Sequence, residues 1–308
     1  MTPELARLGH VALETPDLER SMEFFADAVG FEEVDREGGT VYLRAVDEFD
    51  HHSISLTESD APGVDHIAWQ TADPDSVQGF ADRLEDDGVE VTWIGAGDEL
   101  GQGEAIRFET PTGHPFEIYH EMEKPDPPAE KRSRLKNRVY SPTSTNPVAP
   151  DKIDHVQIRD PEAHECAKWM QDVLGCDVIE YYNLEDGSRW GTFVSACGNK
   201  IEAAVIQDDS ELSPGLHHIA CLVGSGDDLF AANDAMKEQQ VPTDGFGQHS
   251  ISRGKFFYAH DEVSGHRIEF NDGGYVTYDP NWEPVAWNET DLEDRQWAGV
   301  VGGDTVPY

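Results

Sequence analysis

The chain has 308 residues, of which 38% are hydrophobic and 27% are charged, and its formal net charge at pH 7 is −40. This length suits two domains, and the sequence has no apolar run of the roughly 18 residues that a membrane span needs. A negative excess this large repels nucleic acid and anionic membranes, which argues against both as partners. The N-terminus lacks the basic start and apolar core of a signal peptide, so we expect a cytoplasmic protein.

The acidic residues are spread over segments that we expect to fold, and they are not gathered in one tail. Concentrated salt screens the self-repulsion of such a charge, so this composition is typical of a cytosolic protein from a halophile.

A strand–helix–strand–strand–strand order recurs in both halves of the chain. In the first half we expect strands over residues 8–16, 40–46, 52–59, 64–71, 104–111 and 114–120, and helices over residues 17–30 and 75–88. In the second half we expect strands over residues 153–160, 192–198, 201–207, 216–223, 254–261 and 266–272, and helices over residues 163–175 and 227–240. An internal repeat of this size predicts duplicated modules.

The repeat predicts an N-terminal domain over residues 1–122 and a C-terminal domain over residues 152–272. Residues 123–151 are rich in proline and polar residues and are predicted to be a linker. The tail over residues 273–308 carries several tyrosines and tryptophans, so we expect it to pack over the functional site.

Two histidines and a glutamate recur in the same arrangement in both halves. The first set is His10, His66 and Glu117, and the second set is His155, His218 and Glu269. Residues 66 and 117, like residues 218 and 269, are 51 positions apart. Two imidazoles and one carboxylate on one face of a metal leave the opposite positions open, as non-haem Fe(II) oxygenases require. A single histidine of this kind is more often an ordinary half-buried polar residue, but the repeated set favours metal binding.

His217 and His218 are neighbours in a predicted strand, where successive side chains point to opposite faces. Unless the strand bulges there, His217 points away from His218, so we expect only one of the two to bind metal.

These motifs resemble the vicinal-oxygen-chelate superfamily, and within it the type I extradiol dioxygenases of the catechol 2,3-dioxygenase and homoprotocatechuate 2,3-dioxygenase kind. The resemblance covers VYLRAVDEFDHHSISL in the first half, DHVQI, GLHHIA and HRIEF in the second, and DRQWAG near the end. It implies an α+β fold of tandem βαβββ modules with curved mixed sheets, and a homo-oligomer, either a dimer or a tetramer. In this family the C-terminal module holds Fe(II), occasionally Mn(II), which implies His155, His218 and Glu269 as the metal ligands.

The resemblance also implies roles for four residues around the substrate. His249 and Tyr258, nine positions apart, match a histidine and a tyrosine that hold substrate and oxygen through hydrogen bonds. Phe193 and Ile251 match residues that line the substrate pocket, although plain core packing explains these two equally well.

Three positions depart from the family pattern. The family has a histidine–aspartate pair that acts as acid and base, and here Ile201 and Glu202 take those places. Isoleucine cannot move a proton, so either another group does that work, or turnover is slow, or the substrate differs. Asp244 stands where homoprotocatechuate enzymes have an arginine for the substrate carboxylate, which argues against that substrate.

The N-terminal set of His10, His66 and Glu117 would form a second complete metal site, which the family normally lacks. The first module has Asp98 and Arg107 where the second has His249 and Tyr258, so a metal there would have no catalytic neighbours.

We therefore predict a metal-dependent extradiol dioxygenase that cleaves a catechol with O2 to a product of the 2-hydroxymuconic semialdehyde type. A glyoxalase-like metal isomerase or transferase is one alternative, although its metal would usually draw ligands from both modules. A binding protein of the bleomycin-resistance type is the other, although such proteins do not need the second His/His/Glu set.

Overall fold

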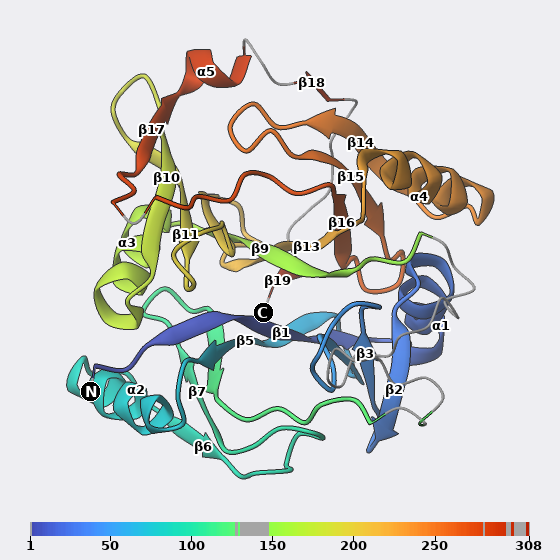
Figure 1. The fold of residues 1–308 in the computed structure, drawn as a ribbon, viewed down its shortest axis with the longest axis horizontal. Coiled ribbons are helices and arrows are strands. Elements are labelled where there is room, and N and C mark those ends of the chain that lie inside the picture. The colour runs from blue at the N-terminus through green and yellow to red at the C-terminus, as the bar shows by residue number, and fades with distance from the viewer. Residues whose placement is uncertain are drawn as a thin grey trace.

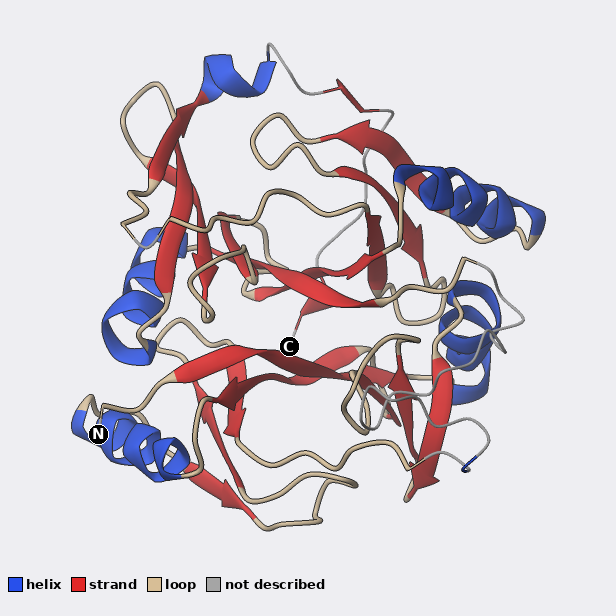
Figure 2. Cartoon of the chain, viewed as in Figure 1, coloured by secondary structure: helices blue, strands red, loops and turns tan. Residues whose placement is uncertain are grey.

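The structure, a computed structural model, describes residues 2–126, 129, 148–279, 281–293, 297–298 and 306–307. Each half of the chain forms one curved mixed sheet, and the two sheets lie against each other with helices at their outer edges (Figures 1 and 2). The predicted α+β class with tandem βαβββ modules is therefore confirmed. The predicted linker falls mostly outside the described residues, and the domain boundaries stay a prediction.

The N-terminal sheet has eight strands in the order β2-β3-β4-β1-β5-β8-β7-β6. They are β1 (Leu5–Thr15), β2 (Glu32–Glu37), β3 (Thr40–Arg44), β4 (Ile54–Glu58), β5 (Gly63–Thr71), β6 (Thr92–Ile94), β7 (Ala105–Glu109) and β8 (Pro115–Tyr119). Its helical segments are α1 (Leu18–Met22), the π-helix η1 (Glu23–Val29) and α2 (Asp75–Asp86).

The C-terminal sheet has the order β17-β10-β11-β12-β9-β13-β16-β15-β14-β18, and β19 pairs with β13. Its strands are β9 (Lys152–Asp160), β10 (Asp177–Asn183), β11 (Arg189–Ser195), β12 (Ala203–Gln207), β13 (Gly215–Leu222), β14 (Thr243–Gln248), β15 (Lys255–His260), β16 (Arg267–Asn271), β17 (Val285–Asn288), β18 (Trp297–Ala298) and β19 (Val306–Pro307). Its helical segments are α3 (Ala163–Trp169), the π-helix η3 (Met170–Leu174), α4 (Gly226–Glu238) and α5 (Glu289–Glu293).

The first helix of each half begins as an α-helix and ends as a π-helix, where the sequence predicts one continuous helix. In the first half, the N–H of Gly30 donates to the carbonyl of Phe25 at 3.2 Å, five residues back. The two segments end at Gly30 and Gly175, whose φ angles of 97° and 77° are left-handed and therefore favour glycine.

Strands β2, β6, β10 and β14 lie outside the strand ranges expected from the sequence. Apolar and polar residues do not alternate regularly along them. Strand β2, for example, reads EEVDRE, and its side chains are exposed or half-buried. Its pairing with β3 comes from backbone hydrogen bonds at the sheet edge, which leave no apolar pattern in the sequence. With these strands added, each unit has the complete βαβββ order.

The two modules are held together by a continuous hydrophobic core and by buried hydrogen bonds. The core cluster contains residues of both halves. His114 and Asp160, both fully buried, are joined by a hydrogen bond of 2.9 Å between Nε2 and Oδ2. At the equivalent place on the other side, His266 Nε2 donates to the backbone carbonyl of Glu14 at 2.9 Å. The joint thus repeats the internal symmetry of the sequence.

The described part of the tail packs on the C-terminal sheet. Strand β17 pairs in parallel with β10, and the side chains of Tyr275 and Trp287 both donate hydrogen bonds to Glu180 at 2.8 and 3.0 Å. Among the described residues, no helix is long and apolar enough to cross a membrane.

Candidate active site

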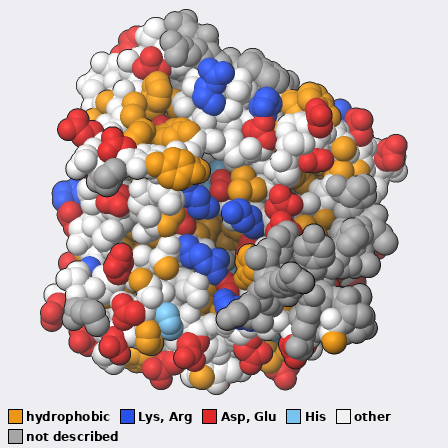
Figure 3. Space-filling model, in the orientation of Figure 1, with side chains coloured by type: hydrophobic (Ala, Val, Ile, Leu, Met, Phe, Trp, Pro, Cys, Tyr) orange, Lys and Arg blue, Asp and Glu red, His pale blue; other side chains and the backbone are white. Residues whose placement is uncertain are grey.

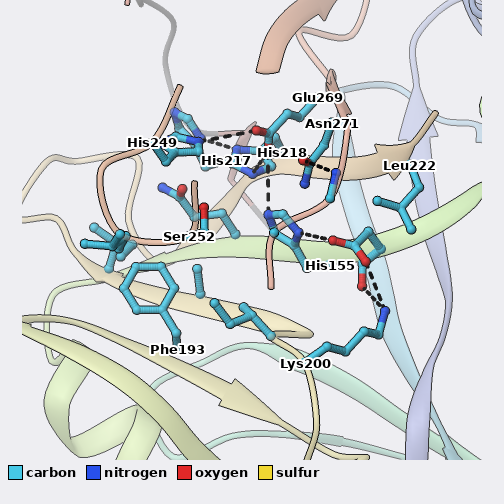
Figure 4. Close-up of a pocket in the computed structure, with 18 of the residues that line it drawn as sticks. His155, Phe193, Lys200, His217, His218, Leu222, His249, Ser252, Glu269 and Asn271 are labelled. Atoms are coloured by element: carbon cyan, nitrogen blue, oxygen red, sulfur yellow. Dashed lines mark hydrogen bonds and ion pairs between the residues drawn. The ribbon is translucent and has the colours of Figure 1, made fainter. Parts of the chain in front are cut away.

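Three neighbouring strands bring His155, His218 and Glu269 together. These residues lie on β9, β13 and β16, and the register places Ala220 of the central strand opposite both His155 and Glu269. The Nε2 atoms of His155 and His218 lie 3.5 and 2.9 Å from Oε2 of Glu269. One ligand atom from each residue lies within 4.8 Å of the others. Figure 4 shows the three side chains converging at one wall of a pocket.

Two atoms of this group suit a metal and do not suit a direct hydrogen bond. His218 Nε2 and Glu269 Oε2 are fully buried and 2.9 Å apart, yet neither makes a hydrogen bond. A buried polar atom without a partner costs about 1–3 kcal/mol. The two-imidazole, one-carboxylate donor set is that of non-haem iron sites.

Outer contacts orient the first histidine. The Oδ2 atom of Asp154 lies 3.0 Å from Nδ1 of His155, and Lys200 Nζ donates to Asp154 Oδ1 at 3.1 Å. Burial opposes the charged form of His155, but Asp154 and Glu269 outweigh it and raise its pKa to about 9. Burial lowers the pKa of His218 to about 4, so that imidazole is neutral at pH 7, whereas a metal would have to displace the proton of His155.

A local bulge in β13 turns His217 toward the pocket beside His218. The register between β9 and β13 shifts between Leu216 and His218, so His217 lines the same pocket. Its ring contacts Arg267 and lies 2.8 Å from His218, Nδ1 to Nδ1. Among the described residues, His218 but not His217 shares a group of potential metal-ligating atoms with His155 and Glu269.

His249 and Tyr258 also border the pocket. His249 Nε2 lies 3.4 Å from Oε1 of Glu269, and its ring stacks on Phe256 with 3.9 Å between centroids. Tyr258 lies directly opposite Glu269 in the pairing of β15 with β16. Burial raises the pKa of the Tyr258 hydroxyl well above its usual range, so it is protonated and able to donate at neutral pH.

The pocket has a volume of about 540 Å³, and most of its remaining wall is apolar. Phe193 and Ile251, the two predicted wall residues, both line it, together with Trp190, Ile201, Ala204, Ile206, Leu222 and Val276. Residues Gly273 to Val276 of the tail also line it, so the tail contributes to this wall.

The amino-acid sequence of this chain is similar to those of known dioxygenases. Residues 64–123 match the catechol 2,3-dioxygenase-like N-terminal domain, and residues 152–270 match the glyoxalase/bleomycin resistance protein/dioxygenase superfamily. A manganese-dependent 2,3-dihydroxybiphenyl 1,2-dioxygenase of Geobacillus genomosp. 3 is 44% identical, over 96% of this chain and 93% of its own length. A metapyrocatechase of Geobacillus stearothermophilus is 32% identical, over 98% of this chain and 92% of its own. The chain belongs to the extradiol dioxygenases.

The fold agrees with this family. Crystalline homoprotocatechuate 2,3-dioxygenase of Arthrobacter globiformis superposes with a TM-score of 0.86 at 24% identity, over 96% of this chain and 88% of its own. The protein is thus a metal-dependent enzyme that cleaves the ring of a catechol with O2. The isomerase and the binding protein, the two alternatives from the sequence, are set aside because full-length relatives are dioxygenases.

The structure shows the surroundings of the three residues that depart from the family pattern. Ile201 lines the pocket, whereas Glu202 is buried and accepts hydrogen bonds from the backbone N–H groups of Leu8, Ala196 and Cys197. Glu202 therefore links the loop after β11 to strand β1 of the N-terminal module. The Oδ2 atom of Asp244 lies 2.8 Å from Nε2 of His260, and Asp244 is not among the residues that line the pocket.

The structure also brings His10, His66 and Glu117 together in the N-terminal module of the dioxygenase, and it adds Glu99. The sequence comparison missed Glu99 because it lies in the loop between β6 and β7 and has no counterpart in the repeated motif. Asp98, which aligns with His249 of the second half, accepts a hydrogen bond from the backbone N–H of Gly95 in an exposed turn.

Proposed function

We propose that His155, His218 and Glu269 bind Fe(II) or Mn(II) in this dioxygenase. The observation that carries the proposal is the convergence of two imidazoles and one carboxylate, with two buried atoms that have no hydrogen-bond partner. The name of the 44% identical relative supports Mn(II) as an alternative to Fe(II). Such a metal would hold both ring oxygens of a catechol beside O2 and spread the charge that moves between them.

His249 and Tyr258 are the residues that we assign to contact the substrate and oxygen. The Tyr258 hydroxyl is buried and protonated, so it is suited to donate a hydrogen bond to an anionic oxygen of the substrate. His249 is about one-third exposed and next to Glu269. Because Ile201 replaces the usual proton-transfer histidine, His249 is the imidazole in the best position to move a proton to or from the reacting ring.

The substrate that the pocket suits best is a catechol with a neutral apolar substituent, such as an aryl group. Phe193, Ile251 and Trp190 provide an apolar wall for such a group. Lys152, Arg159 and Lys200 also line the pocket, and the charge of Lys200 is paired with Asp154. The large negative charge of the chain opposes the approach of anionic substrates at low salt. The product would be a semialdehyde of the 2-hydroxymuconic type that carries the substituent.

We also infer a cytoplasmic homo-oligomer, either a dimer or a tetramer, on the strength of the family resemblance. Light scattering after size-exclusion chromatography in concentrated KCl would give the mass of the assembly. A monomer at micromolar concentration would contradict this inference.

Anaerobic reconstitution with Fe(II) or Mn(II) in concentrated KCl, followed by air and substrate, tests the activity. We expect O2 uptake and a yellow ring-fission product with 2,3-dihydroxybiphenyl, slower turnover with catechol, and the slowest with 3,4-dihydroxyphenylacetate, which carries a carboxylate. Preference for the carboxylate substrate would overturn the assignment of an apolar substituent.

The His218→Ala variant tests the metal ligands. It should lose the C-terminal metal and about 10³-fold or more in kcat, since a metal supplies several kcal/mol of charge stabilisation. The matched control is His164→Ala, because His164 is an exposed histidine on α3. Retention of metal and turnover by His218→Ala, with His164→Ala unchanged, would rule out the ligand assignment.

A further inference from the structure

A second group of potential ligands lies in the N-terminal module, separate from the pocket of the dioxygenase. It consists of His10 on β1, His66 on β5, Glu99 in the loop before β7, and Glu117 on β8. All four residues are buried, with exposed fractions between 0% and 8%. None of them lines the C-terminal pocket.

The ligand atoms of this group have the separations of a metal site. The Nε2 atoms of His10 and His66 are 3.0 Å apart. They lie 3.3 and 3.5 Å from the two oxygens of Glu99, and each lies 3.7 Å from Oε1 of Glu117. Ligands about 2.1 Å from a tetrahedral metal are about 3.4 Å from one another. The four side chains therefore already surround a point that suits a small cation.

The charge of the group favours a divalent cation. Arg107 forms ion pairs with Asp65, Glu99 and Glu117 at 2.9, 2.8 and 2.6 Å. When the histidines are neutral, as metal ligands are, the buried Glu99 and Glu117, the half-exposed Asp65 and the guanidinium of Arg107 together carry a net charge of −2. Buried carboxylates without matching positive charge are costly, and one divalent ion would neutralise this group.

The surrounding contacts resemble those of metal-bound histidines and carboxylates. Asp65 Oδ2 lies 2.6 Å from Nδ1 of His66, which leaves Nε2 free to face the group, and Asp154 plays the same part for His155. Gln102 donates to Glu117 at 2.8 Å, and His52 lies 3.0 Å from Oε1 of Glu99. Each proposed ligand except His10 is thus oriented by an outer hydrogen bond.

We propose that His10, His66, Glu99 and Glu117 bind a divalent first-row transition metal, and that Zn(II) suits this site best. Four protein ligands close the site, as in structural zinc sites, whereas the three ligands of the C-terminal site leave positions open. The strand register supports this difference. Arg107 lies opposite Glu117, where Tyr258 lies opposite Glu269, so a guanidinium takes the place of the catalytic hydroxyl. The metal therefore stabilises the module and takes no part in ring cleavage.

Metal counting in the full chain tests this proposal. The double variant His155→Ala/His218→Ala removes the C-terminal ligands, so any tightly bound metal belongs to the N-terminal site. After chelation and titration with Zn(II), and separately with Mn(II), we expect one metal ion per chain in the double variant and two in the wild type. The melting temperature of the double variant should rise with Zn(II) concentration, since a ligand that binds only the folded state stabilises it.

Adding Glu117→Gln to the double variant should abolish the remaining metal, whereas adding Glu121→Gln, an exposed acid just after β8, should not. His66→Gln serves as a second ligand variant if Glu117→Gln fails to fold. A folded double variant that binds no metal and gains no thermal stability from Zn(II) would overturn the proposal. Because this variant lacks the C-terminal ligands, the result does not depend on whether the proposed catalytic assignment is right.

Discussion

Tyr258 is a buried tyrosine beside the proposed C-terminal ligands, with its ring centroid 5.2 Å from that of His218. Replacing it with phenylalanine removes one donor and keeps the ring that packs against the histidine. A hydrogen bond to a charged group contributes about 1.5–3 kcal/mol, so kcat should fall about 10- to 100-fold while metal content stays the same.

Steady-state kinetics and metal analysis on Tyr258→Phe check this expectation. Tyr181→Phe is the matched control, since Tyr181 lies on β10 beneath the guanidinium of Arg189 and outside the pocket. An unchanged kcat in Tyr258→Phe would mean that the hydroxyl has no part in the reaction.

The apolar side chain of Ile201 bears on how a proton reaches or leaves the substrate. Because the side chain at the usual proton-transfer position is apolar, we propose that His249, which lies 3.4 Å from Glu269, transfers the proton. His249→Asn should therefore lower kcat and change its pH profile, with the metal still bound. A pH profile identical to that of the wild type would show that the proton moves by another route.

Among the elements, the joint between the modules depends on buried polar pairs. Asp160, at the end of β9, is fully buried and accepts from the N–H of Glu162 at 2.6 Å, besides its bond to His114. Burial opposes its ionisation, but the hydrogen bonds from His114, Thr112 and the backbone outweigh it and lower its pKa. The carboxylate form thus stabilises the folded state.

Asp160→Asn should lower the free energy of unfolding by about 3 kcal/mol at pH 7, because removing one partner of a buried pair strands the other. The pKa of Asp160 is lower in the folded than in the unfolded chain. Its contribution is therefore complete above the unfolded value near 3.9 and is lost as the pH falls through the folded value.

Urea titrations of the wild type and of Asp160→Asn at several pH values check this prediction. The difference between the two proteins should shrink below about pH 4. Asp234→Asn, which changes an exposed acid on α4, should behave like the wild type at every pH. A constant difference down to acid pH would mean that Asp160 acts through packing and not through its charge.

For the whole molecule, the net charge of −40 dominates the response to salt. Figure 3 shows acidic side chains spread over much of one face, while lysine and arginine side chains gather near its centre. Salt screens repulsion between exposed charges, so we expect the melting temperature to fall by about 10 °C or more when KCl is lowered from molar to millimolar concentrations.

Calorimetry in KCl and in sucrose of equal osmolality separates screening from general solute exclusion. Sucrose also stabilises folded proteins, but it does not screen charge. Full stability and activity in dilute buffer would refute the interpretation of the composition as halophilic.

The sequence by itself determined the repeated modules, the strands with alternating apolar residues, and the two His/His/Glu sets. These features depend on local periodicity or on fixed spacing along the chain, and both can be read from the sequence without knowledge of the fold. His155, His218 and Glu269 could be grouped in advance because the same pattern occurs twice.

Only the tertiary structure decided the features that depend on contacts between distant segments. Polar strands such as β2 are defined by backbone pairing, which leaves no side-chain pattern. Glu99 lies beside His10, His66 and Glu117 because the loop between β6 and β7 places it there. Glu202 does not line the pocket, because backbone N–H groups of two segments donate hydrogen bonds to its carboxylate. The register shift at His217 and the π-helical ends of the first helices are likewise backbone features that no side-chain pattern in the sequence indicates.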